Sequence, residues 1–142
     1  MVCNVQQLFK EIVKRRDVEI IHRDGKFLVL LAREPLPVSL SQVAKNAGFQ
    51  TPALCNLIGI SERHLRRVFE NGLGISPKEW LRQERMVAAR TLLREGSPIK
   101  QVAMELGFST PKMLSRDFQT FYSVTPTEFQ RKEFSYIAKA VM

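Results

Sequence analysis

The sequence is poor in the residues that hold metals and activate nucleophiles. Its 142 residues include two cysteines, Cys3 and Cys55, and two histidines, His22 and His64. Two cysteines are too few for a disulfide framework or a thiolate metal cluster, and neither histidine has a carboxylate or cysteine at ligand spacing. We therefore expect no metal, no cofactor and no enzymatic activity, and we expect a reducing compartment.

Long apolar runs and glycine-rich phosphate loops are also missing. No apolar segment approaches the roughly 18 to 20 residues of a membrane span, and residues 1–14 lack the order of a signal peptide. Neither a nucleophile elbow nor a paired-acid motif appears. These absences predict a soluble cytoplasmic protein that has no membrane partner.

Positive charge is present in excess. The chain has 22 Lys and Arg against 14 Asp and Glu, a net charge of +8, and residues 39–142 hold 15 of these bases against 9 acids. A basic surface attracts phosphate, but it can equally keep a protein soluble or near an anionic membrane. Charge alone therefore leaves the function open.

Residues 1–38 predict a short helix followed by a β-hairpin. Residues 4–16 carry one apolar helical stripe, and two β-prone runs then flank Asp24-Gly25, a pair suited to a tight turn. Residues 34–37 contain two prolines, break this pattern and mark a boundary. The segment is too short to enclose a small-molecule pocket of the usual size by itself, so its role stays open. Its hairpin edge could pair two chains, and we expect a monomer or a weak dimer.

Beyond residue 38 the chain repeats itself once. Each copy has a glycine turn, at Gly59 and at Gly107, and positions 49 residues apart then recur. The recurring pairs are Leu65 and Leu114, Arg67 and Arg116, Phe69 and Phe118, and Trp80 and Phe129. Two copies of a helix, a glycine turn, a second helix and a Ser/Thr-Pro restart are typical of a pair of helix-turn-helix units.

The repeated region is expected to be helical throughout. The expected helices are 39–47, 52–58, 62–70, 77–95, 98–106, 110–121 and 126–133. Ser76-Pro77 and Thr125-Pro126 each supply a hydroxyl N-cap and a proline at the first helical position, with Glu two residues later. Ser97-Pro98 is expected to supply a cap without the Glu. The inward stripes of the two second helices are expected to be Leu65, Val68 and Phe69, and Leu114, Phe118 and Phe121.

The outward faces of these second helices predict DNA contacts. Arg63, Arg66 and Arg67 share the face opposite the first stripe. The same face of the second unit carries Ser109, Lys112, Met113 and Arg116. Arg and Lys can pair with guanine or grip phosphates, and Met113 can touch a thymine methyl. The alternative is that these are ordinary solvated helix faces. Because a basic face recurs on both second helices, each after a glycine turn, DNA binding is the favoured interpretation.

The helix expected over residues 77–95 suits a linker between the units. Its 19 residues would span about 28 Å at about 1.5 Å per residue, against about 34 Å between successive major-groove faces. One chain could then read two grooves without dimerising. The linker arginines Arg82, Arg85, Arg90 and Arg94 are expected to be solvated.

Together these motifs resemble the DNA-binding region of AraC/XylS-type bacterial transcription regulators. The resemblance covers residues 39 to about 133, and its most specific part is the ordered set IKQVAMELGF, SRDF and TPTEF. It implies a mainly α fold: two helix-turn-helix subdomains (39–75 and 97–133) joined by a linker helix (76–96), with residues 134–142 as a tail. It implies that the residues named above, apart from Ser109, bind double-stranded DNA in the nucleoid, and that the protein contacts RNA polymerase at promoters. Ser109 is expected to bind DNA from its place on the same face. Activator is the role we name, although the sequence leaves activation or repression open.

Two departures and two alternatives remain. Cys55 stands where the pattern usually has Ala and is interpreted as core packing, and Pro111 removes one side chain near a base. A protein-interaction module that contacts RNA polymerase with weak DNA specificity is one alternative function. A DNA-repair regulator is the other, because related domains occur fused to alkyl-transfer modules; it would need an N-terminal cysteine cluster, and Cys3 stands there alone.

Overall fold

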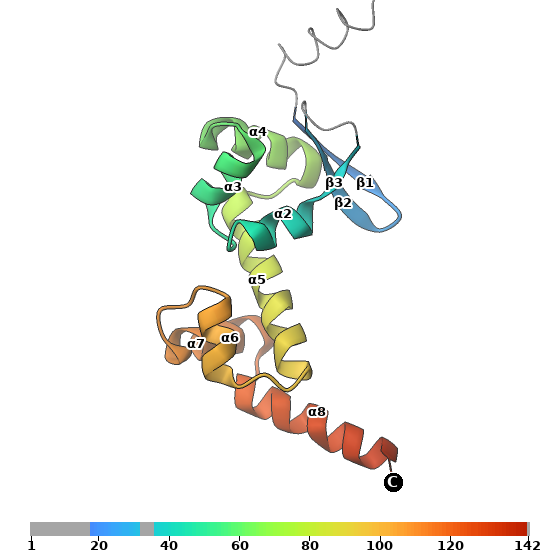
Figure 1. Cartoon of the computed structure of the whole chain (residues 1–142), viewed down its shortest axis with the longest axis vertical. Helices are drawn as coiled ribbons and strands as arrows, with labels where there is room; N and C mark the ends of the chain where they lie inside the picture. The colour runs from blue at the N-terminus through green and yellow to red at the C-terminus, as the bar shows by residue number, and fades with distance from the viewer. Residues whose placement is uncertain (1–17, 32–35, 142) are drawn as a thin grey trace, which may run out of the picture. The chain divides into compact units, whose positions relative to one another are not determined.

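A computed structural model describes residues 18–31 and 36–141 (Figure 1). Its elements are β1 (Glu19–Arg23), β2 (Lys26–Leu30), β3 (Val38–Ser39), α2 (Leu40–Asn46), α3 (Thr51–Ile58), α4 (Glu62–Leu73), α5 (Pro77–Arg94), α6 (Ile99–Glu105), α7 (Pro111–Tyr122) and α8 (Pro126–Val141). The helix expected over residues 4–16, Cys3 and the first half of the expected boundary at 34–37 lie outside the described residues.

The seven expected helices are all present, and the mainly α class is confirmed. Their ends agree within a few residues except for α8, which continues to Val141 instead of ending near 133. Residues 134–141 contain neither Gly nor Pro and include two alanines and a lysine, so nothing in them stops a helix. The chain divides into two compact units, and the break falls within α5, between Leu81 and Arg82.

The sheet belongs to the first unit. β2 pairs antiparallel with β1 and with β3, in the order β1-β2-β3. Asp24 and Gly25 form the β1–β2 turn with φ of 52° and 75°, as the sequence predicts. β3 was not expected, because two residues are too short to show an alternating pattern. The paired side chains of Ile20 and Val29 are buried, so one face of the sheet joins the core.

The helices of the first unit pack through large apolar side chains. Leu54, Leu65 and Phe69 are fully buried, and the Phe69 ring meets the Trp80 ring edge-on, with centroids 5.5 Å apart. Ser76 Oγ accepts a hydrogen bond from the Glu79 backbone N–H at 3.2 Å, which confirms the expected cap of α5. The start of the linker helix is thus held against the end of α4.

Gly72 of α4 lets the helix approach β1 closely. A Cβ built on Gly72 would lie 2.8 Å from Ile20 Cβ and 3.4 Å from the Ile20 carbonyl oxygen. Atoms of a buried strand cannot move aside as the tip of a flexible side chain can. The absence of a side chain at Gly72 therefore sets the distance between the hairpin and α4.

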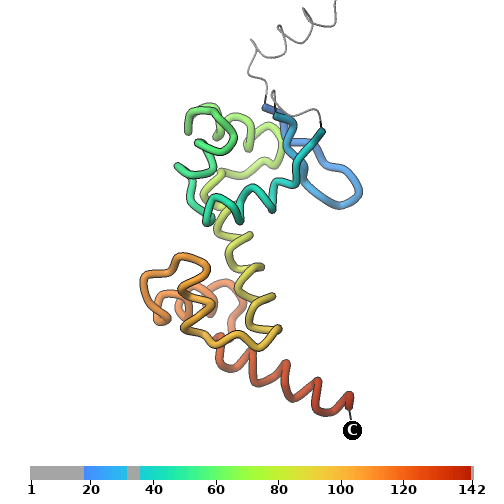
Figure 2. Tube along the Cα trace, viewed as in Figure 1, coloured from blue at the N-terminus to red at the C-terminus, as the bar shows by residue number. Residues whose placement is uncertain are grey.

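The second unit is built from the rest of α5 with α6, α7 and α8 (Figure 2). Its core contains Met86, Leu93, Val102, Leu114 and Phe118, all nearly or fully buried. Phe121 was expected in this core but is 38% exposed. Tyr122 lies nearer the core instead: its ring is tilted by 51° against the Phe118 ring, with centroids 4.8 Å apart. In a helix, a residue four positions after Phe118 lies closer to the face of Phe118 than a residue three positions after it.

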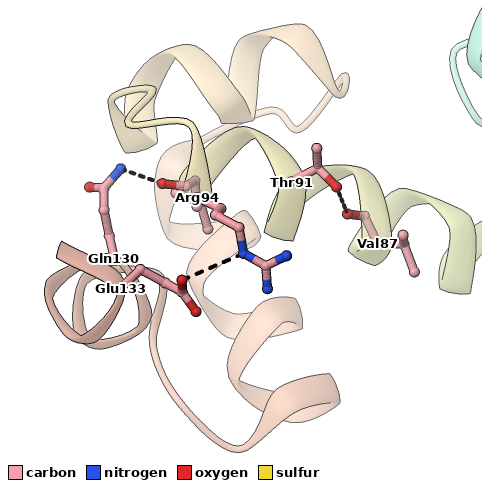
Figure 3. A network of polar contacts seen from close by, with 6 residues as sticks. Val87, Thr91, Arg94, Gln130 and Glu133 are labelled. Atoms are coloured by element: carbon pink, nitrogen blue, oxygen red, sulfur yellow. Dashed lines mark hydrogen bonds and ion pairs between the residues drawn. The ribbon is translucent and has the colours of Figure 1, made fainter. Parts of the chain in front are cut away.

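The base of α8 is tied to the end of α5. Gln130 Nε2 donates to the carbonyl oxygens of Leu93 and Ser97 at 3.1 and 2.9 Å, and Arg94 Nε lies 3.5 Å from Glu133 Oε2 (Figure 3). At the start of α8, Thr125 and Glu128 exchange backbone-to-side-chain hydrogen bonds, the expected cap. Ser97 does not cap α6, whose N-cap residue is Pro98.

We expect Gly72→Ala to destabilise the first unit by about 1–2 kcal/mol, because the clash with Ile20 outweighs the gain in helix propensity. Urea unfolding followed by the fluorescence of Trp80, the only tryptophan, measures this. Asn71→Ala is the control at the neighbouring exposed position and should be neutral or slightly stabilising. Equal stability of Gly72→Ala and the natural chain would contradict the close approach.

Candidate nucleic-acid interface

A glycine turn separates the two helices of the first helix-turn-helix unit. α3 ends at Ile58, and Gly59 then adopts a left-handed φ of 83° while its N–H donates to the Cys55 carbonyl at 2.7 Å. Ser61 caps α4 by accepting a hydrogen bond from the His64 N–H at 3.1 Å. Glycine tolerates this left-handed turn, and the hydroxyl fixes where α4 begins.

The three arginines predicted to face DNA all lie on the exposed side of α4. Leu65, Val68 and Phe69 are buried on the opposite side, as expected. Arg63, Arg66 and Arg67 are exposed. In the part of the chain that the structure describes, no Asp or Glu lies within ion-pair distance of any of them. Their guanidinium groups therefore remain available to an anionic partner.

The second unit repeats this local design. α6 is followed by Gly107 with φ of 76°, and Thr110 Oγ1 caps α7 by accepting from the Met113 N–H at 3.2 Å. Pro111 occupies the first helical position, where no backbone N–H is needed. Leu114 and Phe118 are fully buried, which fixes the opposite side of α7 as the exposed one.

The outward residues of the second unit are also exposed. Ser109 precedes α7, Lys112 lies in its first turn, and Met113 is 39% exposed. Arg116 Nε lies 3.8 Å from Asp117 Oδ1, and the arginine side chain is 73% exposed. An ion pair this long and this exposed contributes little stability, so Arg116 can exchange it for a phosphate or a base.

Arg85 of α5 holds the turn of the second unit, a role not expected from the sequence. Its Nε donates to the Leu106 carbonyl at 2.7 Å, and its guanidinium lies 3.9 Å above the centre of the Phe108 ring. Burial lowers the pKa of Arg85, while the charge of Asp117 acts in the opposite direction. The expectation of a solvated side chain is therefore wrong for Arg85. Arg85 lies four residues from both Leu81 and Ala89, which are buried. This spacing places it on the inward side of α5 and was the sequence signal for its role.

Cys55 lies in the core of the first unit, as the sequence predicts. Cys55 is buried, and its pKa is raised first by burial and then by the charge of Glu62. A thiol with a raised pKa is a poor nucleophile. No group of three or more His, Cys, Asp or Glu is placed to hold a metal within residues 18–31 and 36–141.

None of the helices that the structure describes is both long enough and apolar enough to span a membrane.

We expect Arg85→Met to loosen the second unit, because methionine fills the space but loses the hydrogen bond to Leu106 and the cation–π contact. The loss should be about 1–3 kcal/mol and should appear as faster amide hydrogen exchange in α6 and α7, with α2–α4 unchanged. The control is Arg82→Met, at an exposed position of the same helix, which should leave exchange as it is. Unchanged exchange in Arg85→Met would show that the turn does not depend on Arg85.

Comparison with known proteins identifies the family. A helix-turn-helix domain model matches residues 54–132, more than half of the chain. The probable transcription factor PqrA of Proteus vulgaris is 30% identical over 91 residues, 63% of this chain and 75% of that protein. The lactose operon transcription activator of Staphylococcus xylosus is 30% identical over 138 residues, 95% of this chain but 45% of that protein. This chain thus spans less than half of that activator.

Solved structures show the same fold. An AraC-type transcriptional regulator from Chromobacterium violaceum is 25% identical, with a TM-score of 0.56 over 66% of this chain and 90% of that one. The DNA-binding domain of AdpA, a global transcriptional factor solved in complex with a target DNA, has a TM-score of 0.59 at 23% identity, over 68% of this chain and 94% of that one. The two glycine-turn units, the exposed basic faces and these matches agree: the chain belongs to the AraC/XylS family of helix-turn-helix transcription regulators that bind DNA.

Proposed function

We propose that the protein reads promoter DNA by placing α4 and α7 in two successive major grooves. The observation that carries the proposal is the repeated design of the two helices. Each follows a glycine turn, has a hydroxyl cap and buries one apolar side. The opposite side of each carries exposed cations, Arg63, Arg66 and Arg67 on α4 and Lys112 and Arg116 on α7. Helices that enter a major groove present such faces to base edges and phosphates.

The outward residues divide by chemistry into base readers and phosphate binders. Arg66 and Arg67 can each form a bidentate pair with guanine O6 and N7. Met113 supplies an apolar contact for a thymine methyl, and Ser109 supplies a hydroxyl before α7. Lys112 is a point charge that suits a phosphate oxygen. In this proposal the arginines of α4 and Met113 give the sequence specificity. The remaining cations bind the DNA phosphates and fix the position of the protein along the duplex.

The length of α5 supports two-groove reading by one chain. Its 18 residues span about 27 Å at about 1.5 Å per residue, and successive major-groove faces lie about 34 Å apart. The two lengths are of the same order, so α5 is long enough to connect units that bind successive grooves. In this proposal a monomer occupies both grooves.

RNA polymerase is the second partner we propose. Almost all of this chain, 95% of it, is similar to part of a protein named a transcription activator. Activation requires contact with the transcription machinery. The chromosome and the polymerase share the bacterial cytoplasm, which would then be where the protein acts.

The test removes single arginines and measures binding to a DNA sequence selected from a random pool. We expect Arg66→Ala or Arg67→Ala to cost about 1–3 kcal/mol in binding and to relax the preference at one base position. Arg131→Ala, which removes an exposed cation from α8, is the control and should keep the preference at every position.

Two results distinguish the possible roles. If the substitution weakens binding to all DNA sequences equally, and the slope of log affinity against log salt concentration falls by about one, the arginine binds a phosphate. Binding that shows no preference for the selected sequence over random DNA would reject sequence-specific regulation and leave a protein-interaction module as the better account.

A further inference from the structure

A half-open hollow lies between β1 and α4 in the first unit. Its volume is about 440 Å³, and it is lined on one side by Glu19 and Ile20 of β1 and by the preceding Val18. This volume falls within the range of about 300–1,000 Å³ that small-molecule sites occupy. The start of the hairpin and the helix α4 line this space together.

Three hydrogen-bond donors of α4 line the other side of the hollow. His64, Arg67 and Asn71 follow one another at spacings of three and four and so share one face of the helix. No hydrogen bond or ion pair occupies any of their side chains within the described residues. Arg67 adds a permanent positive charge, so an anionic group is the partner that this row of donors fits.

Apolar side chains also line the hollow. Ile20 and Val68 line it and are buried, each with 7% of its surface exposed. Gly72 lets α4 come close to Ile20, and both apolar side chains line the same hollow as the three donors. Glu19 is the only acid among the lining residues, and its charge disfavours a ligand with a second negative charge nearby.

We propose that this hollow binds a small organic monoanion. Its carboxylate would pair with Arg67 and accept hydrogen bonds from His64 or Asn71, and its apolar body would lie on Ile20 and Val68. A neutral molecule of the same shape lacks the charge that Arg67 recognises, and a bare inorganic anion lacks the apolar body.

Binding at this hollow would oppose DNA binding, a consequence that rests on the proposed function. Arg67 lines the hollow and also belongs to the outward face of α4, so one guanidinium serves both partners. A ligand that holds Arg67 lowers the affinity for DNA, and by thermodynamic linkage DNA lowers the affinity for the ligand by the same factor.

The first experiment titrates the full chain, without DNA, with cyclohexanecarboxylate and follows the amide resonances by NMR. We expect saturable shifts confined to residues 18–20 and 64–72, and none from the neutral control cyclohexanecarboxamide. Arg67→Gln should weaken binding about tenfold or more, because it removes a charge-assisted pair. The matched control Arg63→Gln, at an exposed arginine of the same helix outside the hollow, should change it less than about twofold.

Several outcomes would overturn the proposal. Absence of shifts in the hollow, equal shifts from the amide, or equal weakening in Arg63→Gln and Arg67→Gln would each reject a specific site. The last would indicate general attraction to a basic helix.

The second experiment repeats the DNA-binding measurement with the carboxylate present, using chloride at equal ionic strength as the reference. We expect weaker DNA binding by the natural chain and no effect of the carboxylate on Arg67→Gln. Saturable carboxylate binding with unchanged DNA affinity would reject the antagonism while leaving the site. DNA binding measured without the carboxylate tests the proposed function separately, so the two failures remain distinguishable.

Discussion

The burial of one apolar side of each recognition helix is the interaction on which the rest of the molecule depends. Leu65 and Phe69 of α4, and Leu114 and Phe118 of α7, are fully buried at equivalent positions of the two units. Because a helix has a fixed period, burying these side chains determines which residues face outward. The core therefore determines the direction in which the arginines and the lysine on the opposite sides point, and the long, exposed ion pair of Arg116 with Asp117 adds little to it.

Different contacts hold the recognition helix in place in each of the two units. In the first, a hairpin packs on α4, and the missing side chain of Gly72 allows Ile20 to come close. In the second, no sheet is present among the described residues, and Arg85 holds the turn through the Leu106 carbonyl and the Phe108 ring. α8 adds a further tie to the end of α5 through Gln130. A duplicated motif has thus acquired unit-specific contacts around a common pair of helices.

Much of this arrangement could be predicted from the sequence, because the signals are local. Helix caps such as Ser76 and Thr125, the glycine turns and the apolar spacing each depend on a few neighbouring residues. The missed features depend on contacts between distant segments. Arginine side chains are usually solvated, and Arg85 is held in the fold only because Leu106 and Phe108 come close to it. The hollow beside Arg67 also could not be foreseen, since it arises from the packing of β1 on α4.

The claim to test is the proposal that one chain reads two successive grooves with α4 and α7, which α5 connects. The most direct measurement inserts about half a helical turn, ~5 bp, between the two contacted halves of a selected DNA site, and compares it with an insertion of about a full turn. We expect the half-turn insertion to abolish the specific part of binding, because it turns the two halves of the site to opposite sides of the duplex. We expect the full-turn insertion to weaken binding as well, because α5 cannot lengthen. Unchanged affinity for both insertions would contradict the claim.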